Sequence, residues 1–419
     1  MLHLFKPKSD FSKNVLTLMT GTIVAQAIPI IISPILTRLY TPEDFGLFGL
    51  FMGLAMILSS LVSGKYELAI LLPEKEEDVI SIFSLTFFII CFISIVLFII
   101  IFIFNDDLVE MLNNKDIKYW LYFIPFVTFF VGLFNLLTYY HIRLKNYRVI
   151  SNASVIKSLT LALFQLLIGF FKNGVTGLIS GQIVSQMFAN INLFRHIIES
   201  KKEYFYAINR AKLLKVALRY IDFPKFSVWS VLLNSSVVNL VNIFIPILFG
   251  YATLGFYMLA QRVLGLPSMV LGQSIGKVFY EEAVSQKKKF GSTQTIFLST
   301  LKRLFLMGFV IFTLLFMTIE DVIYFVFGKD WLTSAFIIKI LIPLFFIRFM
   351  SSSLSSLLMV YEKQRVELIV NMVLFFTTMI LLFINQNDFI KFLTLYSLFM
   401  SINYLILLSY MYRLSKGDM

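Results

Sequence analysis

Charged side chains are scarce in this chain. Only 14% of its 419 residues are Asp, Glu, Lys or Arg, whereas 58% are hydrophobic and 47 are phenylalanine. A soluble domain could not bury so much apolar surface. Apolar runs recur along the sequence, and most reach the roughly 20 residues that a helix needs to cross a bilayer. Because the short alternating segments of a membrane β-barrel do not appear, the sequence predicts an all-α polytopic membrane protein.

Groups that carry chemistry are scarce as well. The single cysteine, Cys91, excludes an intramolecular disulfide. The three histidines, His3, His141 and His196, are too far apart in the sequence to suggest a metal motif. A Gly-rich phosphate loop is also missing. We therefore expect no metal, no cofactor and no catalytic constellation, and we predict that the chain is not an enzyme.

The apolar runs divide into about twelve predicted transmembrane helices. The first run is too long for the core of a signal peptide, so we keep it as a mature helix. The predicted helices cover residues 14–40, 43–70, 78–104, 118–141, 148–171, 174–196, 224–249, 252–279, 293–319, 331–360, 366–385 and 389–412.

The basic residues predict the orientation of these helices. The net charge of +12 could indicate nucleic acid, but the cations are not gathered in one soluble domain. If the N-terminus is cytoplasmic, most loop cations fall on the inner side, which is the asymmetry expected when cationic loops stay on the cytoplasmic side. We predict both termini inside, the bilayer as surroundings and no nucleic-acid partner. The outer loops then hold only Lys115, Lys118, Lys172, Lys329 and Lys391.

The two halves of the chain show signs of an internal repeat. The longest inner connection carries the amphipathic "NRAKLLKVALRY", which predicts a cytoplasmic linker over 197–223 between six-helix bundles at 1–196 and 224–419. A shift of 209 residues places Phe45 and Gly46 on Leu254 and Gly255. Six helices per half make the repeats parallel, related by a pseudo-two-fold axis along the membrane normal. This arrangement is typical of transporters that have a central site between two bundles.

Polar residues follow one face of the first helix and of the seventh. The spacing of Thr22, Gln26, Pro29, Ser33 and Thr37 keeps them on a single helical face. Such residues can simply hold helices together. A matching set in the second half slightly favours a shared cavity instead, with Gln26 and Asn242 as candidate cargo contacts. The matching set is Ser235, Asn239, Asn242 and Pro246.

Basic residues also lie inside the predicted helices. Arg262 is about ten residues into its helix, roughly 15 Å from the outer end. Even a low estimate for a central arginine is about 2.5 to 3.5 kcal/mol, so Arg262 must face water, a ligand or a carboxylate partner. Gln273, eleven residues on, would share its face in a straight helix. Both are candidate cargo residues.

The helix predicted over 331–360 carries two more cations. Lys339 and Arg348 lie about 180° apart on a straight helix, so both can face one cavity only if Pro343 kinks it. Arg348 is the deeper one, whereas Lys339 can extend to the outer interface. Acids are rarer, with Glu67 as the weak candidate for a proton or sodium relay. This excess of cations favours an anionic cargo such as a phosphate headgroup.

The turn between the first two helices, "TRLYTPEDFGLFGLF", predicts a structural hairpin. Arg38 and Tyr40 are expected at the outer interface, and Thr41 is expected to cap the next helix with Pro42 as its first residue. Arg38 is the one residue of this turn that we keep as a candidate for facing the cavity and binding cargo.

The segments around these residues are similar to a known family. The first, "ILTRLYTPEDFGLFGLFMGLAMILSSLVSGKYELAILLPEKEEDVISI", resembles the N-terminal signature of bacterial oligosaccharide flippases, within the multidrug/oligosaccharidyl-lipid/polysaccharide exporter superfamily. Three later segments also resemble it, and together they span helices 1 to 3 and 7 to 10. They are "DFPKFSVWSVLLNSSV", "LGFYMLAQRVLGLPSMVLGQSIGKVFYEEA" and "FGKDWLTSAFIIKILIPLFFIRF".

The resemblance implies a flippase for a lipid-linked oligosaccharide, typically an undecaprenyl-diphosphate repeat unit of O antigen, capsule or a similar polymer. It implies alternating access of two bundles, with Arg262 and Arg348 as the basic residues that meet the diphosphate or acidic sugars. It also makes a polysaccharide polymerase and chain-length machinery candidate partners. From the residues alone we infer only a transporter of an anionic amphiphile.

Three alternatives stay open. A drug or organic-ion antiporter of the same superfamily would need a buried acid in its cavity. A flippase for a lipid-linked peptidoglycan precursor usually has about two more helices. A polysaccharide polymerase, which is a membrane enzyme, would show a large outer loop with catalytic residues, and the short outer loops predicted here disfavour it.

Overall fold

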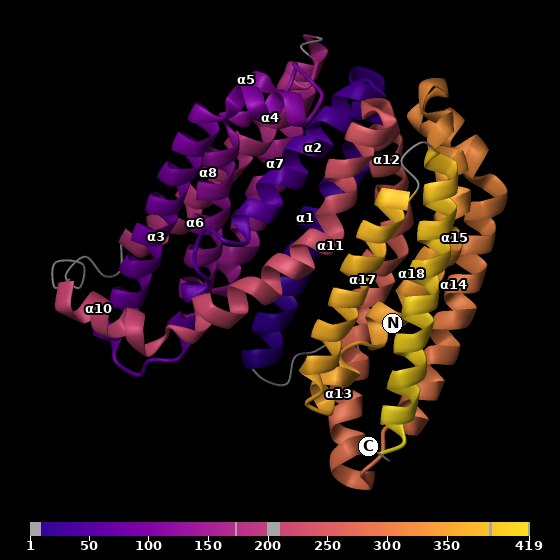
Figure 1. Cartoon of the computed structure of the whole chain (residues 1–419). Coiled ribbons are helices and arrows are strands. Elements are labelled where there is room, and N and C mark those ends of the chain that lie inside the picture. The colour runs from indigo at the N-terminus through magenta and orange to yellow at the C-terminus, as the bar shows by residue number, and fades with distance from the viewer. Residues whose placement is uncertain (1–9, 172–173, 199–209, 385–387, 418–419) are drawn as a thin grey trace. The chain divides into compact units, whose positions relative to one another are not determined.

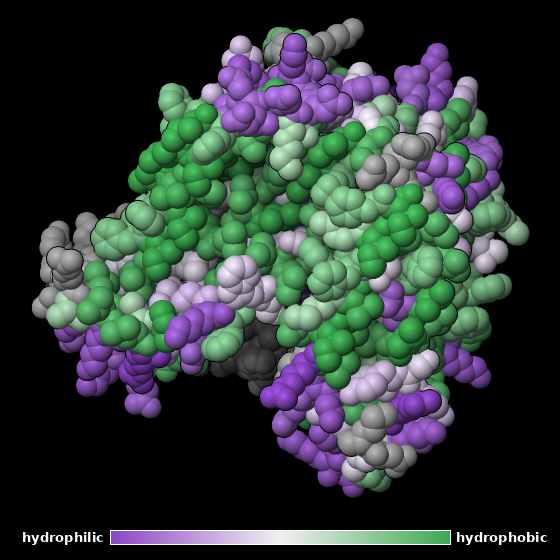
Figure 2. Space-filling model, viewed as in Figure 1, coloured by the Kyte–Doolittle hydropathy of each residue, from purple (hydrophilic) through white to green (hydrophobic). Residues whose placement is uncertain are grey.

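The computed structural model of the protein describes residues 10–171, 174–198, 210–384 and 388–417. Every regular element in these ranges is a helix (Figure 1). Figure 2 shows hydrophobic residues over the middle of the helices and hydrophilic residues near their ends, as expected for a multi-pass membrane protein. The predicted all-α class is confirmed.

The packing divides the chain into two compact units. The first comprises the described residues up to Tyr40 together with Leu47–Asn239, and the second comprises Thr41–Gly46 and the described residues from Leu240 onward. The elements up to the middle of α11 are α1 (Asp10–Leu39), α2 (Pro42–Ser59), η2 (Tyr66–Leu71), α3 (Glu76–Ile103), α4 (Asn105–Met111), α5 (Lys118–Leu121), α6 (Ile124–Arg143), α7 (Tyr147–Phe170), α8 (Thr176–Ile198), α10 (Arg210–Arg219), η3 (Phe223–Ser227) and α11 (Val228–Phe249).

The second unit is built from the helices of the C-terminal half. They are α12 (Tyr251–Pro267), η4 (Ser268–Gly272), α13 (Gln273–Phe290), α14 (Gln294–Val322), η5 (Ile323–Phe327), η6 (Lys329–Trp331), α15 (Leu332–Leu354), α16 (Leu357–Val360), α17 (Gln364–Ile384) and α18 (Phe389–Ser415).

The number of helices that could cross a membrane is close to the prediction. In the described part of the chain, eleven helical segments are long and apolar enough to do so. The predicted helix at 174–196 exists as α8, but the amides Gln182, Gln186 and Asn190 recur along it and lower its hydropathy. These amides are buried, and Asn190 Nδ2 donates to the carbonyl oxygen of Phe130 in α6 at 2.9 Å. The polar face of α8 therefore packs against protein.

The boundary between the units differs from the predicted domain ends. The first half of α11 stays with the first unit, where Ser235 Oγ donates to the carbonyl oxygen of Met56 in α2 at 3.4 Å. The opening turn of α2, Thr41–Gly46, belongs to the second unit. The division into 1–196 and 224–419 remains a prediction about the repeat, because the packing does not separate the chain at those residues.

The predicted linker, 197–223, contains a docked helix. Val216 of α10 and Tyr220, which directly follows the helix, belong to the buried core of the first unit, together with residues of η2, α3 and α6. The remainder of the linker, 199–209, lies outside the described residues, as does Lys172 of the predicted outer loops. The described part of the linker is thus an integral piece of the first unit.

The second predicted helix, 43–70, is too long. In the structure α2 ends at Ser59, and the chain turns through Gly64 and Lys65 before the short 3₁₀-helix η2. Both residues have left-handed backbone angles, with φ of 57° and 60°. Gly64 takes this conformation freely, whereas Lys65 is strained there. Apolar residues continue after this turn, so the hydrophobic pattern of the sequence did not reveal it.

The helix predicted at 252–279 is longer and less regular than expected. It continues through the π-helical turn η4 and α13 to Phe290, and Gly291 ends it with a φ of 71°. The sequence after Lys277 is polar, so the apolar pattern ends before the helix does. A π-turn carries no clear sequence signal, and it rotates the residues that follow it.

Of the predictions for the turn between α1 and α2, the cap is confirmed and the position of Tyr40 is wrong. Thr41 caps α2 as predicted, because the Asp44 N–H donates to Thr41 Oγ1 at 3.2 Å and the Thr41 N–H donates to Asp44 Oδ2 at 3.0 Å. Tyr40 is not the interfacial anchor that we predicted. It is 3% exposed, and its hydroxyl donates to the carbonyl oxygen of Gln165 in α7 at 2.6 Å.

The crossing of α2 and α12 supports the predicted repeat. A Cβ on Gly46 would lie 1.9 Å from the carbonyl oxygen of Tyr251, and a Cβ on Gly255 would lie 1.9 Å from that of Pro42. A shift of 209 residues converts Gly46 into Gly255 and Pro42 into Tyr251, so the two contacts are equivalent and reciprocal. Reciprocal contacts of this kind arise at a two-fold axis. The two helices therefore cross at a local two-fold axis, and the predicted shift of 209 residues relates their contacts.

Candidate functional site

Arg262 lies on α12 beside a cluster of aromatic rings. It is half-buried, roughly 16 Å from the start of the helix, and its guanidinium lies 5.9 Å from the ring centroid of Phe45. The Phe45 ring meets Trp331 edge-on at 5.1 Å, and Trp331 meets Phe256 at 6.0 Å. A planar guanidinium suits contact with an aromatic face. The guanidinium of Arg262 therefore lies beside this aromatic cluster within an apolar helix.

Two distant segments bring these rings together. Phe45 comes from the first turn of α2, which the Thr41 cap and the Gly46 crossing position, and Trp331 ends the short helix η6 before α15. Both are buried, at 2% and 1% exposure. The sequence did not reveal the cluster, although both residues lie in segments that carry the family resemblance.

Arg348 lies on α15, in the candidate span Lys329–Val360, and its side chain is exposed on the surface of the second unit. Its guanidinium is 5.7 Å from the ring of Phe345. In the described chain no carboxylate forms an ion pair with it. A charged arginine on a spanning helix costs too much to face lipid tails, so this face of α15 meets water or a charged ligand.

A tyrosine network lies behind Arg348. Tyr257 of α12 is 1% exposed, and its hydroxyl interacts with the side chains of Gln261 and of Tyr396 in α18. Arg348 interacts electrostatically with both tyrosines. Because Gln261 directly precedes Arg262, the network joins the helices that carry the two arginines. The sequence did not indicate this network, since single tyrosines in apolar helices have no distinctive spacing.

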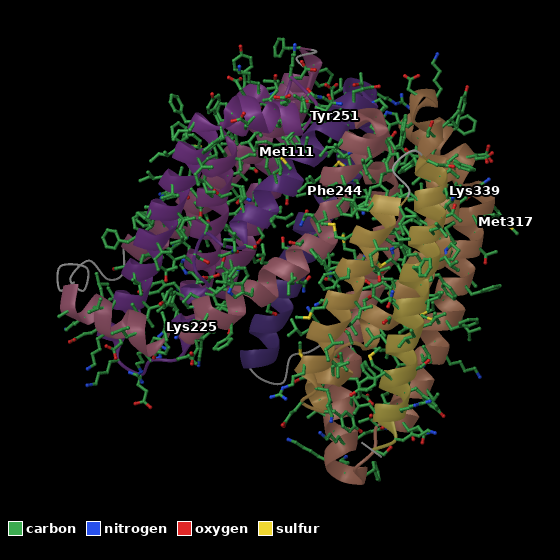
Figure 3. All side chains as sticks on the ribbon, in the orientation of Figure 1. Met111, Lys225, Phe244, Tyr251, Met317 and Lys339 are labelled. Atoms are coloured by element: carbon green, nitrogen blue, oxygen red, sulfur yellow. The ribbon has the colours of Figure 1, made fainter. Side chains whose placement is uncertain are left out.

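Lys339 has its own partners. Its Nζ forms an ion pair with Glu320 of α14 at 2.5 Å and lies 5.5 Å from the ring of Phe316. Figure 3 labels Lys339 on the side of the unit formed by α14 and α15. The ion pair with Glu320 explains the charge of Lys339 within the helix without a bound cargo.

The expectation for Gln273 depended on a straight helix, and that premise is wrong. The π-helical turn η4 lies between Arg262 and Gln273 and changes their angular relation. Gln273 is exposed at the start of α13. Its contact with cargo stays a prediction.

The polar faces of α1 and α11 are largely satisfied within the protein. Ser33 Oγ donates to the carbonyl oxygen of Pro29 at 2.7 Å, and Asn239 Nδ2 donates to that of Ser235 at 2.9 Å. These bonds favour the alternative in which small polar residues support helix packing. Asn242 is an exception, because its buried Oδ1 has no hydrogen-bond partner.

The two candidates on α1 belong to the first unit. Gln26 is half-buried in the middle of the helix, and Arg38 is exposed in its last turn. The structure thus brings Arg262, Arg348 and Asn242 into one unit, apart from these two residues. Their roles in cargo binding remain predictions.

Acids and metal ligands give no competing site. Among the described residues Glu67 is the one buried acid, at 1% exposure, and its Oε1 lies 3.6 Å from Lys65 Nζ while its Oε2 has no partner. No group of three or more His, Cys, Asp or Glu residues in the described ranges could hold a metal ion.

Comparisons with known proteins agree with this arrangement. A family model described as "polysaccharide biosynthesis protein" matches residues 35–336, well over half of the chain. No curated protein sequence matches this chain.

Solved transporters share the fold. An inward-facing multidrug resistance MATE family transporter of the MOP superfamily has a TM-score of 0.68 at 14% identity, over 95% of this chain and 93% of its own. The lipid II flippase MurJ, in an inward closed conformation, has a TM-score of 0.73 at 13% identity, over 95% and 86%. An outward-facing MATE transporter has a TM-score of 0.58 at 13% identity, over 96% and 94%.

These comparisons show the family and the fold. The chain belongs to the polysaccharide biosynthesis protein family, on the multi-span helical fold found in MATE transporters and in MurJ.

Proposed function

We propose that this protein is a flippase that moves an undecaprenyl-diphosphate-linked oligosaccharide across the bacterial cytoplasmic membrane. The cargo would be a repeat unit of O antigen, capsule or a similar polysaccharide. Membership of a polysaccharide biosynthesis family supports the pathway, and a fold shared with transporters supports movement across the membrane. The charges inside the second unit support an anionic cargo.

The observation that carries this proposal is Arg348. It is exposed on a spanning helix, lacks an ion pair within the described residues, and is backed by Tyr257 and Tyr396. A guanidinium can hold a diphosphate through two parallel hydrogen bonds, which would repay the cost of keeping the charge at membrane depth. Arg262, which lies beside Phe45, would supply a second positive charge.

The transport cycle would be alternating access, in which the cargo site opens first to the cytoplasm and then to the outside. Both chain termini would be cytoplasmic, because the loop cations then lie on the inner side. A polysaccharide polymerase and its chain-length machinery would receive the repeat unit on the outer surface.

A drug antiporter is the second candidate, because multidrug transporters have the same fold. Such a protein would use a buried acid to bind a cation. The buried acid described here, Glu67, already lies beside Lys65, which favours the anionic cargo.

Depletion of the protein in its host tests the proposal. Lipid-linked intermediates would be extracted and their leaflet determined with a membrane-impermeant probe. We expect complete repeat units to accumulate on the inner leaflet. Units trapped on the outer leaflet would point to a polymerase instead, and unchanged intermediates with altered drug sensitivity would point to a drug antiporter.

A further inference from the structure

The outward face of α10 carries exposed hydrophobic residues. Leu214 and Leu218 are 65% and 64% exposed, and their spacing of four places them side by side along the helix. Lys215 and Arg219 are exposed at the same spacing. This is the composition of a helix that lies flat at a membrane surface, with an apolar stripe next to cations.

The opposite face of α10 is fixed against the first unit. Val216 and Tyr220 are in the buried core, Lys212 Nζ pairs with Glu77 at 2.7 Å, and the Tyr66 hydroxyl donates to the carbonyl oxygen of Ala217 at 3.0 Å. Rotation of the helix would break all of these contacts. Leu214 and Leu218 therefore cannot turn inward, and their exposure is a stable property of the fold.

Exposed residues also follow the end of α10 in the chain. Lys225 lies in the turn before α11 (Figure 3), and Phe226 and Trp229 are 69% and 61% exposed. Tryptophan on a membrane protein is enriched at the headgroup level. Within the described residues, neither Lys215 nor Lys225 forms an ion pair with a carboxylate.

The contacts of α10 set its level relative to the bilayer. Glu77, its ion-pair partner, is the second residue of the candidate span Glu76–Ile103, and the next span begins at Phe223. The helix therefore lies where two spanning helices enter the membrane. At this level a leucine can reach the acyl boundary while a neighbouring lysine reaches lipid phosphates.

We propose that Leu214, Lys215, Leu218, Arg219, Lys225 and Trp229 form a docking surface for anionic phospholipid headgroups. We call it the α10 face. In the proposed orientation it binds the cytoplasmic leaflet and ties the linker to the membrane. This inference concerns lipids around the protein and does not depend on the identity of the cargo.

The test uses the full chain in lipid nanodiscs. Cys91→Ser removes the only cysteine, and Leu218→Cys then carries an environment-sensitive fluorophore. The discs contain phosphatidylcholine alone or mixed with phosphatidylglycerol, with brominated acyl chains as quenchers. We expect stronger quenching of the label when phosphatidylglycerol is present. The double variant Lys215→Glu with Arg219→Glu, which reverses two charges, should lose this increase. Each cation removed should weaken docking roughly fivefold.

The matched control makes the same change in charge elsewhere. Lys288→Glu with Lys289→Glu alters two exposed lysines of α13 and should leave the Leu218→Cys signal unchanged. A label that stays in water in both lipid mixtures would overturn the inference, as would a lipid response that survives reversal on the α10 face. A label shielded by a co-purified protein rather than by lipid would also contradict it.

Discussion

At the scale of single residues, the cost of charge in a membrane gives the clearest clue to function. Arg348 is exposed on a spanning helix, whereas Lys339 on the same helix pairs with Glu320. The same helix thus offers one cation that has a structural explanation and one that lacks it. This difference makes the two residues a natural test pair.

The charge and the shape of Arg348 can be separated by substitution. We expect Arg348→Lys to keep part of the transport rate, because the charge remains and the bidentate geometry is lost. Arg348→Ala should reduce the rate by at least about tenfold, since a hydrogen bond to a charged group is worth about 1.5 to 3 kcal/mol. Initial rates of lipid-linked oligosaccharide translocation in proteoliposomes would measure both.

The matched control is Lys339→Met, which removes a cation from the same helix. It should leave the rate unchanged and lower the stability by at most about 1 kcal/mol, because the pair with Glu320 is partly exposed. Equal losses of transport in the Lys339 and Arg348 variants would contradict the assignment, and so would a fully inactive Arg348→Lys.

Arg262 is expected to be required for transport but not for insertion. Arg262→Ala should abolish translocation while expression and membrane insertion stay normal, because the aromatic contacts of Phe45 with Trp331 persist without it. Proteoliposomes with equal amounts of folded protein, checked by size-exclusion chromatography, provide the measurement. Wild-type rates in this variant would refute the role of Arg262.

The sequence identified both arginines but not their surroundings. Charges stand out in apolar runs because their burial is costly. The contact between the Phe45 and Trp331 rings, and the interaction between Tyr257 and Tyr396, join residues far apart in the chain. Aromatic residues are common in every helix here, so nothing in the sequence marks those that meet.

At the scale of helices, the crossing of α2 and α12 depends on two glycines. The backbones approach so closely that a methyl group at Gly46 or Gly255 would overlap a carbonyl oxygen. Unlike a side chain, a backbone carbonyl in a helix cannot move aside without disturbing its own hydrogen bonds. The crossing also positions Phe45 beside Arg262.

Gly255→Ala should therefore destabilise the protein by about 1 to 3 kcal/mol, the usual cost of overpacking. Thermal unfolding in detergent, followed by tryptophan fluorescence, would measure the change. Gly265→Ala, on the same helix, is the control, because its Cβ would meet nothing within 4 Å. Alanine there should be neutral or stabilising, since it is the better helix former. Similar losses of stability in both variants would contradict the close crossing.

Helix existence was easier to predict than helix ends. Apolar length located the helices, since each must span the bilayer. The left-handed Lys65 and the π-turn at η4 are set by local backbone geometry, which the apolar pattern does not encode. The buried position of Tyr40 depends on its bond to Gln165 in α7, a contact invisible in the turn sequence itself.

At the scale of the whole molecule, the internal repeat remains a prediction, which the reciprocal contacts of Gly46 and Gly255 support. The shift of 209 residues that aligned Gly46 with Gly255 also relates the two halves of their contact. The packing units do not follow the repeat, because α2 and α11 are each divided between the two units. Such sharing depends on side-chain contacts rather than on the hydrophobic pattern.

The most direct test of the account is translocation of a defined lipid-diphosphate oligosaccharide by the purified protein in proteoliposomes. Sugar exposed on the outer surface would be detected with an impermeant lectin or oxidant. We predict translocation that depends on the protein and that falls sharply in Arg348→Ala while Lys339→Met keeps the wild-type rate. Absence of protein-dependent translocation, or equal rates in Arg348→Ala and wild type, would contradict the account.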